Sequence, residues 1–427
     1  MSKAIVIGAG VIGSSIALEL SRNGDDVIVI DKGAGAGQGS TSASSAIIRF
    51  NYSTLDSIAL AWESYHCWKN WREHLGIELI SYSQLIDVGV LMLDAPEIAK
   101  ERIADLYNQA KIPFELWDKE TLAMKLPHLD PGKYGPPKSI SDEGFWEDST
   151  DSLGALFTPQ GGYVNDPLLA AENLADAARS HGAQFRFKSV VTKVMQKGNR
   201  IIGVEINGSE KITADVVVNA CGPWSSEINK MAGVGSEFTI SVRPMRQEVH
   251  QVNAPLNLLP GPIMGDLDLG IYMRGTPNGG LLVGGTEPEC DPLEWVDNVD
   301  KVNMNRTQER FEAQVTRAAR RLPALQIPNT PLGIVGVYDV ASDWTPIYDR
   351  TDLAGFYVAI GTSGNQFKNA PMVGKIMCQL ISEVEAGRNH DVEPVRVHCG
   401  HTGNGINMGV FSRKRQFNSE SSGTVMG

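Results

Sequence analysis

Apolar and polar positions alternate in blocks near the start of the chain and predict a strand, a helix and a second strand. Residues 4–8, AIVIG, form a short β-branched run that is typical of a buried parallel strand. The stretch SSIALELSRNG has helical spacing and ends at Gly24, and VIVID then predicts a strand that ends at Asp31. DVVVNACGPW and FYVAIG are further continuous apolar runs of the same kind. The pattern therefore predicts a parallel sheet with strands near residues 4, 27, 216 and 356.

The segments between these strands carry both periodicities and predict a second region. Predicted helices cover residues 54–76, 96–110 and 303–323, and a further helix has Asp166 as its N-cap, Pro167 in its first turn and Gly182 at its end. Predicted strands cover residues 84–93, hairpin-like runs in QFRFKSVVTKVMQ and RIIGVEIN, and several runs within 240–290. Residues 127–147 are rich in Pro and Gly and predict a connection.

These elements predict the α/β (α+β) class, with a Rossmann-like domain assembled from discontinuous segments and a substrate domain that contains a mixed β-sheet. A chain of 427 residues suits two domains, or one large domain with an insertion. We assign residues 1–85, 148–235 and 332–395 to the nucleotide-binding domain, and residues 86–147 and 236–331 to the substrate-binding domain. Residues 396–427 are polar and glycine-rich, and we expect them to form an extended C-terminal arm.

The charge and the cysteines narrow the class of protein. The net charge of −12, from 38 basic and 50 acidic residues, argues against a nucleic-acid or anionic-membrane surface. No run approaches the roughly 18 apolar residues that span a bilayer, and the start MSKAIVIGAG has no signal-peptide pattern. Five scattered cysteines without C-x-x-C spacing favour reduced thiols and a cytoplasmic protein. His398, Cys399 and His401 are too weak a pattern to predict a metal site.

The first glycine-rich turn has the spacing of a dinucleotide cradle. Gly8 permits a tight turn, Gly10 lets a pyrophosphate approach the backbone, and Gly13 lets the helix pack closely on the strand. The helix N-terminus then offers free N–H groups to phosphates. Asp31, 18 residues beyond Gly13, is placed to accept hydrogen bonds from a ribose. The alternative is an ordinary βαβ unit with loop glycines.

The segment after Asp31 bears on which dinucleotide is bound. KGAGAGQGSTSASSAIIRF is a long loop of small residues, where a simple NAD-binding fold would proceed quickly to its next helix. Its hydroxyl groups and backbone N–H groups suit a long, extended cofactor, which favours FAD over NAD.

At this point the sequence resembles the FAD-dependent amine and amino-acid oxidoreductases of the D-amino-acid oxidase superfamily, and within it the monomeric sarcosine oxidase and dimethylglycine dehydrogenase-like proteins. The matching stretches are IVIGAGVIG with VIVID, GSTSASSAIIRFNY, PQGGYVNDP, VVNACGPW and VAIGTSGNQFKNAP. The resemblance implies that the second glycine turn, 361–371, leads into a helix that begins near Asn365 and directs its N–H groups at the flavin ring.

The resemblance also implies a set of FAD-binding residues, and all of them except Val191 lie in or beside these stretches. They are Gly8, Gly10, Val11, Ile12, Gly13, Asp31, Lys32, Ser40, Thr41, Ser42, Ser45, Val191, Ala220, Gly222, Trp224, Gly361, Gly364, Asn365, Gln366, Phe367 and Lys368.

Three residues match positions that contact substrate in sarcosine oxidase-like proteins, and a fourth is a further candidate. Arg49 and Lys368 correspond to the pair that binds the substrate carboxylate, in which a guanidinium clamps both oxygens and an ammonium adds a second charge. Tyr338 matches a substrate-contacting tyrosine, and Tyr272 could shape the same pocket. As alternatives, Arg49 would form a surface or phosphate salt bridge, Lys368 would be a solvated helix residue, and the tyrosines would be core aromatics.

Departures from the family pattern carry further expectations. Gly336 stands where sarcosine oxidase has its flavin-linking cysteine, and the STSASSA loop lacks the histidine of dimethylglycine-type relatives, so we expect FAD to be bound non-covalently. Leu282 replaces the lysine associated with oxygen activation, which favours a dehydrogenase with another acceptor over an oxidase that uses O₂. Ala46 replaces an arginine near the ring.

The predicted reaction is hydride transfer from the carbon attached to nitrogen to flavin N5, which gives an imine that water hydrolyses. The expected substrate is a small secondary or N-methyl amino acid such as sarcosine. The alternatives are a primary amine or D-amino acid, a flavin subunit that works with a partner in a larger complex, and an NAD-dependent dehydrogenase, which the second glycine turn disfavours.

Overall fold

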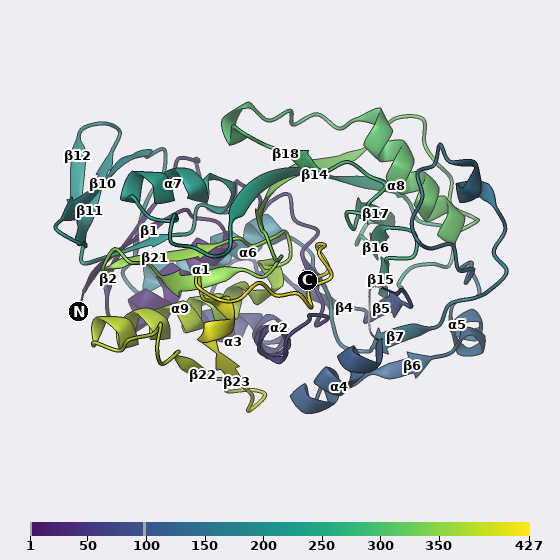
Figure 1. The fold of residues 1–427 in the computed structure, drawn as a ribbon, viewed down its shortest axis with the longest axis horizontal. Coiled ribbons are helices and arrows are strands. Elements are labelled where there is room, and N and C mark those ends of the chain that lie inside the picture. Colours follow the sequence, from purple (N-terminus) through teal and green to yellow (C-terminus); the bar gives the residue numbers. More distant parts are fainter. Residues whose placement is uncertain (1, 97–99) are drawn as a thin grey trace.

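The computed structural model describes residues 2–96 and 100–427, and its two largest sheets occupy opposite sides of the view in Figure 1. The first sheet has six strands in the order β20-β21-β13-β1-β2-β9. Their bounds are Lys3–Ile7 for β1, Asp26–Ile30 for β2, Gln184–Arg186 for β9, Val216–Asn219 for β13, Ile347–Arg350 for β20 and Phe356–Ile360 for β21. Neighbours are parallel except β20, which runs antiparallel to β21. The four strands predicted from apolar runs are β1, β2, β13 and β21, so this prediction is confirmed.

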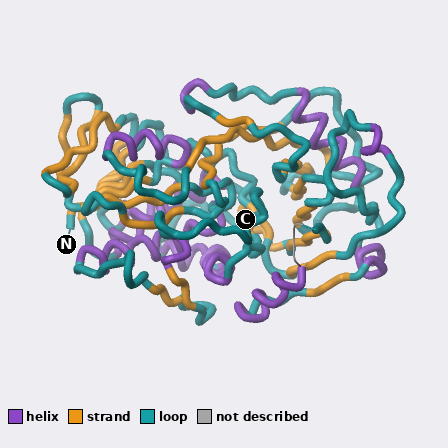
Figure 2. Tube along the Cα trace, viewed as in Figure 1, coloured by secondary structure: helices purple, strands orange, loops and turns teal. Residues whose placement is uncertain are grey.

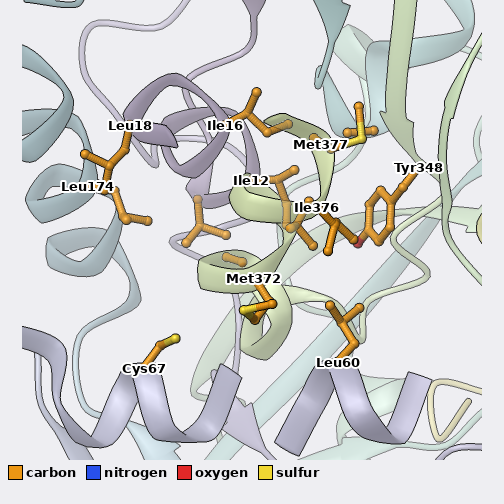
Figure 3. Packing of buried hydrophobic residues seen from close by; sticks show 14 of the residues in the cluster. Ile12, Ile16, Leu18, Leu60, Cys67, Leu174, Tyr348, Met372, Ile376 and Met377 are labelled. Atoms are coloured by element: carbon orange, nitrogen blue, oxygen red, sulfur yellow. The ribbon is translucent and has the colours of Figure 1, made fainter. Parts of the chain in front are cut away.

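Both faces of this sheet are covered, because successive residues of a strand point to opposite sides. Val6 of β1 belongs to the apolar cluster under three helices, and its neighbour Ile7 belongs to a separate cluster on the other face. The helices are α1 (Val11–Arg22), α6 (Pro167–Ser180) and α9 (Ala370–Glu385). Figure 3 shows Ile12, Leu18, Leu174 and Ile376 in the layer where they meet. The other face is covered by α7 (Ser225–Ala232) and the sheet of β10 (Val191–Lys197), β11 (Arg200–Ile206) and β12 (Glu210–Thr213).

The second large sheet has nine strands and is mixed. Its path is β18-β14-β17-β16-β15-β5-β7-β6, and β19 pairs with β14 off this path. The strands are β5 (Val90–Leu93), β6 (Glu115–Trp117), β7 (Ala155–Thr158), β14 (Val242–Asn253), β15 (Ile263–Asp266), β16 (Ile271–Gly275), β17 (Gly280–Gly285), β18 (Glu294–Trp295) and β19 (Gly333–Ala341). Only β5 and β15 pair in parallel among these described strands. Phe311 and Val315 of α8 (Gln308–Arg321) pack on one face.

Smaller elements connect these layers. They are the sheet of β3 (Ile47–Ile48), β8 (Gly162–Val164) and β4 (Leu85–Asp87), the helices α2 (Leu55–Lys69), α3 (Trp71–Leu75), α4 (Lys100–Ala110) and α5 (Lys119–Lys125), and the 3-10 turns η1 (Glu143–Trp146), η2 (Gly222–Trp224) and η3 (Val299–Lys301). None of the helices in the described part of the chain is both long enough and apolar enough to cross a bilayer. The division of the chain into two domains at the boundaries given above stays a prediction.

Several predicted elements are broken by local backbone geometry. The single helix predicted over 54–76 is α2 followed by α3, because Asn70 between them has a non-helical backbone with ψ of 44°. The strand predicted over 84–93 is β4 and β5 in different sheets, since Gly89 turns the chain with φ of +78°. The strand predicted at QFRFKSVVTKVMQ is likewise split into β9 and β10.

One predicted helix begins later than expected, and the start of another falls partly outside the described residues. The helix predicted over 303–323 begins at Gln308, because the side chain of Thr307 caps it by accepting a hydrogen bond from the backbone N–H of Arg310. The helix predicted over 96–110 is α4 from Lys100, and residues 97–99 of that prediction lie outside the described residues.

The segment 396–427 folds onto the rest of the protein, so the prediction of an extended arm is wrong. It forms a hairpin of β22 (Arg396–His398) and β23 (Gly405–Asn407) and the turn η5 (Met408–Phe411). Buried Arg413 then pairs with Asp349 at 3.0 Å and with Asp391 at 2.8 Å. These ion pairs fix a segment that has few apolar residues. The end of the chain lies between the two large sheets in Figure 1, and Figure 2 shows it as loop.

Candidate active site

A cavity of about 540 Å³ runs between the turn after β1 and the loop before α9. One end is lined by Gly8, Gly10 and Asp31, and the other by Arg49 and Lys368. Strands of both large sheets contribute to its wall, since Ile30 belongs to β2 and Tyr338 to β19. The carboxyl ends of β1 and β2 therefore open into a space that the second sheet closes, as expected for a ligand site in an open parallel sheet.

The first end has the geometry of a phosphate cradle. Gly8 has φ of +104°, and a Cβ there would lie 2.9 Å from the carbonyl carbon of Ala220. A Cβ on Gly13 would overlap with the carbonyl oxygen of Gly8, so only glycine lets α1 start this close to β1. α1 begins at Val11, and its N-cap residue Gly10 has no side chain that could cap the helix. The start of α1 therefore faces the cavity with its backbone.

Asp31 holds this turn together. Its Oδ2 atom accepts a hydrogen bond from the N–H of Ala9, and its Oδ1 atom accepts one from the N–H of Gly33, both at 2.6 Å. The carboxylate thus joins the cradle to the loop that follows β2, and Asp31 also lines the cavity.

The loop of small residues ties the cradle to the second sheet. Thr41 accepts a hydrogen bond from the N–H of Val11 at 3.1 Å. The hydroxyl of Ser40 donates to the carbonyl of Val337 in β19 at 2.6 Å, and the hydroxyl of Ser45 lies 2.8 Å from that of Tyr272 in β16. These contacts place the loop along the length of the cavity.

The second glycine turn forms the far end and leads into a helical segment. This segment starts as the 3-10 helix η4 (Phe367–Asn369) and continues as α9 from Ala370, so the α-helix itself begins later than the start predicted near Asn365. Gly364 has φ of +68°, and any Cβ there would overlap with the ring of Tyr338. This turn therefore serves to bring Lys368 and Tyr338 to the same end of the cavity.

Arg49 and Lys368 are both buried at this end, with 5% and 3% of their surface exposed. The Lys368 ammonium donates to the Oη atom of Tyr52 at 2.9 Å and to the carbonyl of Asn365. The Arg49 guanidinium donates to the carbonyls of Asn51 and, at 2.7 Å, of Val425. Among the described residues, neither cation forms an ion pair with a carboxylate. Lys368 is thus not a solvated helix residue, and Arg49 is not part of a surface salt bridge.

Burial perturbs the pKa values at this end. It lowers the pKa of Arg49 and holds the pKa of Lys368 well below its ordinary value, and the nearby Arg49 charge lowers the latter further. Burial also raises the pKa of Tyr272 to about 12 and raises that of Tyr338 well above its ordinary value. Both tyrosines therefore stay protonated and can donate hydrogen bonds. Their rings line the cavity, which is a further role beside that of core aromatics.

Most residues predicted to contact cofactor or substrate line this one cavity. They are Gly8, Gly10, Val11, Ile12, Asp31, Lys32, Ser40, Thr41, Ser45, Val191, Ala220, Gly222, Trp224, Gly364, Asn365, Gln366, Phe367, Lys368, Arg49, Tyr272 and Tyr338.

Gly13, Ser42 and Gly361 do not line the cavity. Gly13 lies where α1 packs on the carbonyl of Gly8, and Gly361 turns the chain at the end of β21 with φ of +67°. The hydroxyl of Ser42 is directed to the carbonyl of Gly39 at 3.0 Å. The first two shape the turns, and Ser42 stabilises its own loop.

Several residues at the cavity were not predicted from the sequence. Tyr52, Gln247, Asp339 and Val425 either line the cavity or hold a residue that does. Tyr52 lies in the FNY stretch that follows Arg49, and an aromatic hydroxyl this close to a predicted substrate-binding cation could have indicated it. Gln247, Asp339 and Val425 carry no local pattern, because only the pairing of distant strands and loops brings them to the cavity.

The residues that depart from the family pattern also have clear positions. A Cβ on Gly336 would lie 3.1 Å from that of Ala43, so the cavity wall is closely packed there. Ala46 lines the cavity, whereas Leu282 in β17 does not. Within the described residues, the cations that line the cavity are Lys32, Arg49 and Lys368, and no histidine does.

A glycine cradle at one end of a cavity and buried cations at the other indicate an α/β protein that binds a dinucleotide together with an anionic group. Residues 3–380 match the DAO family, FAD dependent oxidoreductase, and the chain belongs to this family. The chain is thus a member of the FAD-dependent oxidoreductases, and its mixed α/β fold is that of the family.

Known relatives extend this comparison. The chain is 24% identical over 414 residues to 4-methylaminobutanoate oxidase (formaldehyde-forming) from Paenarthrobacter nicotinovorans, covering 94% of this chain and 46% of that protein. It therefore spans less than half the length of that relative. The L-proline dehydrogenase from P. horikoshii superposes with a TM-score of 0.74 and 25% identity, over 90% of this chain and 94% of the other. Glycine oxidase from Geobacillus kaustophilus gives a TM-score of 0.71 at 21% identity, over 97% and 99%.

The residues present fit FAD. Gly8 and Gly10 line the end of the cavity where a pyrophosphate would lie, and Gly13 lets α1 pack on the carbonyl of Gly8 beside it. The cavity continues from this end past the small-residue loop to the buried cations. The Oδ2 atom of Asp339 and the Nδ2 atom of Asn365 are buried near the far end without a hydrogen-bond partner among the described residues. Such orphaned polar atoms are expected where a polar ring system binds.

Proposed function

We propose that the protein oxidises the C–N bond of a small secondary or N-methyl amino acid, with non-covalently bound FAD. The observation that carries this proposal is the pair of buried cations, Arg49 and Lys368, that meet at one end of the cavity without a carboxylate partner.

The electrostatics favour an anionic substrate group at this end. A buried charge is costly unless it is paired, and both cations are hydrogen-bonded only to neutral oxygens. A substrate carboxylate would compensate both. A guanidinium can hold two carboxylate oxygens at once, whereas an ammonium acts as a single point charge. Arg49 would therefore orient the carboxylate and Lys368 would strengthen its binding.

The rest of the far end suits a small apolar group on the substrate. Met92, Ile263 and Met264 line the cavity beside Tyr272 and Tyr338. A methyl group or a small ring on nitrogen would contact these side chains and lose water on binding. The cavity residues thus hold the carboxylate at one point and the amine substituent at another, which fixes the C–H bond in one direction.

Proton movement in this proposal begins at the substrate amine. Two cations beside the carboxylate lower the pKa of the substrate ammonium, so the amine binds in its neutral form. FAD, when bound, supplies the acceptor for two electrons from the carbon attached to nitrogen. The imine that remains is then hydrolysed by water.

The names of relatives agree with a substrate of this kind. One is an oxidase of 4-methylaminobutanoate, which carries both a methylamino group and a carboxylate, and another is a dehydrogenase of L-proline, a secondary amine. Glycine oxidase is named for a primary amino acid, so oxidation of a primary amine stays the alternative. O₂ or another acceptor, a partner subunit and a cytoplasmic location stay predictions.

Steady-state turnover of four related compounds tests this proposal. With an artificial acceptor, sarcosine and L-proline should give a higher kcat/KM than glycine, and dimethylamine, which lacks the carboxylate, should be the poorest substrate. Dimethylamine as good as sarcosine would overturn the role of the two cations. Glycine preferred over sarcosine would move the assignment to primary amines.

A further inference from the structure

Residues 418–426 form a strap that is fixed to several parts of the protein. The side-chain amide of Asn418 donates to the hydroxyls of Ser53 at 2.9 Å and of Thr345 at 3.1 Å. Glu420 forms an ion pair with Arg102 of α4. The strap therefore has a defined path across the substrate end of the cavity.

The peptide groups of Val425 are held from two sides. Its N–H donates to the Oε2 atom of Glu287 at 2.8 Å, and its carbonyl accepts from the Nη2 atom of Arg49 at 2.7 Å. The other carboxylate oxygen of Glu287 accepts from the side-chain amide of Gln247 at 2.9 Å, which fixes the direction of this carboxylate. Arg49 precedes α2 and Glu287 follows β17, so the strap joins the two sides of the cavity.

Met426 extends from this clamp into the apolar wall of the cavity. It is 6% exposed and belongs to the same apolar cluster as Met92, Ile263 and Val425. A Cβ on Gly265 of β15 would lie 3.2 Å from the Cε atom of Met426 and 2.6 Å from that of Met92. Only glycine at position 265 leaves room for both methionines, and all three residues line the cavity.

We propose that the strap is the outer wall of the substrate pocket and that Met426, together with Met92, determines how large a substituent on the substrate the pocket accepts. This inference rests on the proposed function, because it assigns the far end of the cavity to the substrate. Val425 and Met426 are specificity-determining residues, which act through contact with the substrate and not in the transfer of electrons. In an apolar pocket, contacts of this size discriminate between ligands about 10- to 200-fold.

Binding of two carboxylates that differ in size tests this inference without turnover. Acetate and phenylacetate are titrated against the flavin-loaded protein, and the change in the flavin absorption spectrum gives each Kd. The proteins compared are the wild type, Met426→Ala, a variant that lacks residues 421–427, and Met304→Ala. Met304 is 58% exposed and does not line the cavity, so it is a matched control.

We expect the wild type and Met304→Ala to bind acetate more tightly than phenylacetate. Met426→Ala and the shortened variant should bind phenylacetate more tightly. The Kd for phenylacetate divided by the Kd for acetate should therefore fall about tenfold in both. An unchanged ratio in both variants, with acetate still bound, would overturn the role of the strap and leave the proposed function intact. If acetate does not perturb the flavin of any of the four proteins, the carboxylate site itself is wrong and the role of Met426 falls with it.

Discussion

The ammonium nitrogen of Lys368 lies 2.9 Å from the phenolic oxygen of Tyr52, although the two residues are 316 positions apart in the chain. This hydrogen bond joins the turn before α9 to the loop before α2. It also shows how the fold fixes a buried ammonium group in one place beside Arg49, whose guanidinium carbon lies 5.2 Å from the centre of the Tyr52 ring. The region where a carboxylate would bind is therefore built before any substrate arrives.

Lys368→Met should stabilise the protein without ligand and weaken substrate binding. In the folded protein the pKa of Lys368 is held well below its ordinary value, which applies to the unfolded state. Between these two pKa values the unfolded state binds more protons, so the free energy of unfolding rises with pH. Methionine removes the cost of the buried charge, which should raise Tm by roughly 2 °C near neutral pH.

Thermal unfolding at about pH 7 and about pH 10 checks this prediction, because the gain should shrink as the lysine of the unfolded state loses its proton. A lower Tm for Lys368→Met at both pH values would contradict it.

Arg49→Ala should raise KM for an amino-acid substrate about 100-fold, because loss of one partner of a buried charge pair costs a few kcal/mol. The effect on an amine without a carboxylate should be small. Arg49→Lys should recover only part of the loss, since an ammonium lacks the fork of donors. Arg243, half exposed and paired with Asp297, provides the control: Arg243→Ala should leave KM unchanged. Equal KM values for Arg49→Ala and the wild type would exclude the carboxylate clamp.

Gly13→Ala should yield a protein with little bound flavin. Its Cβ would overlap with the carbonyl oxygen of Gly8 and push α1 away from the cradle. The ratio of flavin to protein absorbance after purification measures this loss. Gly405→Ala is the matched control, since a Cβ there meets no atom within 4 Å, and it should keep the wild-type ratio.

Glu287 should make the stability of the protein fall as pH rises. Burial raises its pKa to about 8, and Asp291 adds to this shift, while the N–H of Val425 and the charge of Arg310 oppose it. At pH values above the ordinary pKa of a glutamate, the unfolded state has released this proton, whereas the folded state keeps it up to about pH 8. The free energy of unfolding therefore falls as pH rises from the ordinary pKa to about 8.

Tm values of the wild type and Glu287→Gln at about pH 5 and about pH 8 test this sign. The glutamine has no proton to lose, so its Tm should fall less between the two pH values. An equal fall in both proteins would assign the pH dependence to other groups.

The parts of the fold that depend on short-range patterns could be predicted from the sequence. The apolar runs of β1, β2, β13 and β21 and the glycine spacing around Gly8 are local signals, and all four strands lie in one sheet. The break at Asn70 and the turn at Gly89 were missed, because helical or strand-like composition continues through both positions.

The candidate site could be predicted only where motifs mark it. Arg49 and Lys368 entered through the likeness of their stretches to a known family. Glu287 and Val425 lie in no recognisable motif. They are 138 positions apart, and only the folded strap brings them into contact. Single-sequence periodicity contains no information on a contact of this kind.

The most direct test of the central claim is anaerobic reduction of the bound flavin by sarcosine or L-proline, followed by its visible absorption. We predict that the flavin bands of the wild type bleach, and that Arg49→Ala with the same flavin content needs far more substrate for the same bleaching. Bands that persist in the wild type with both compounds, or equal bleaching in the two proteins, would contradict the account of Arg49 and Lys368 as the site that binds the carboxylate of an amino acid.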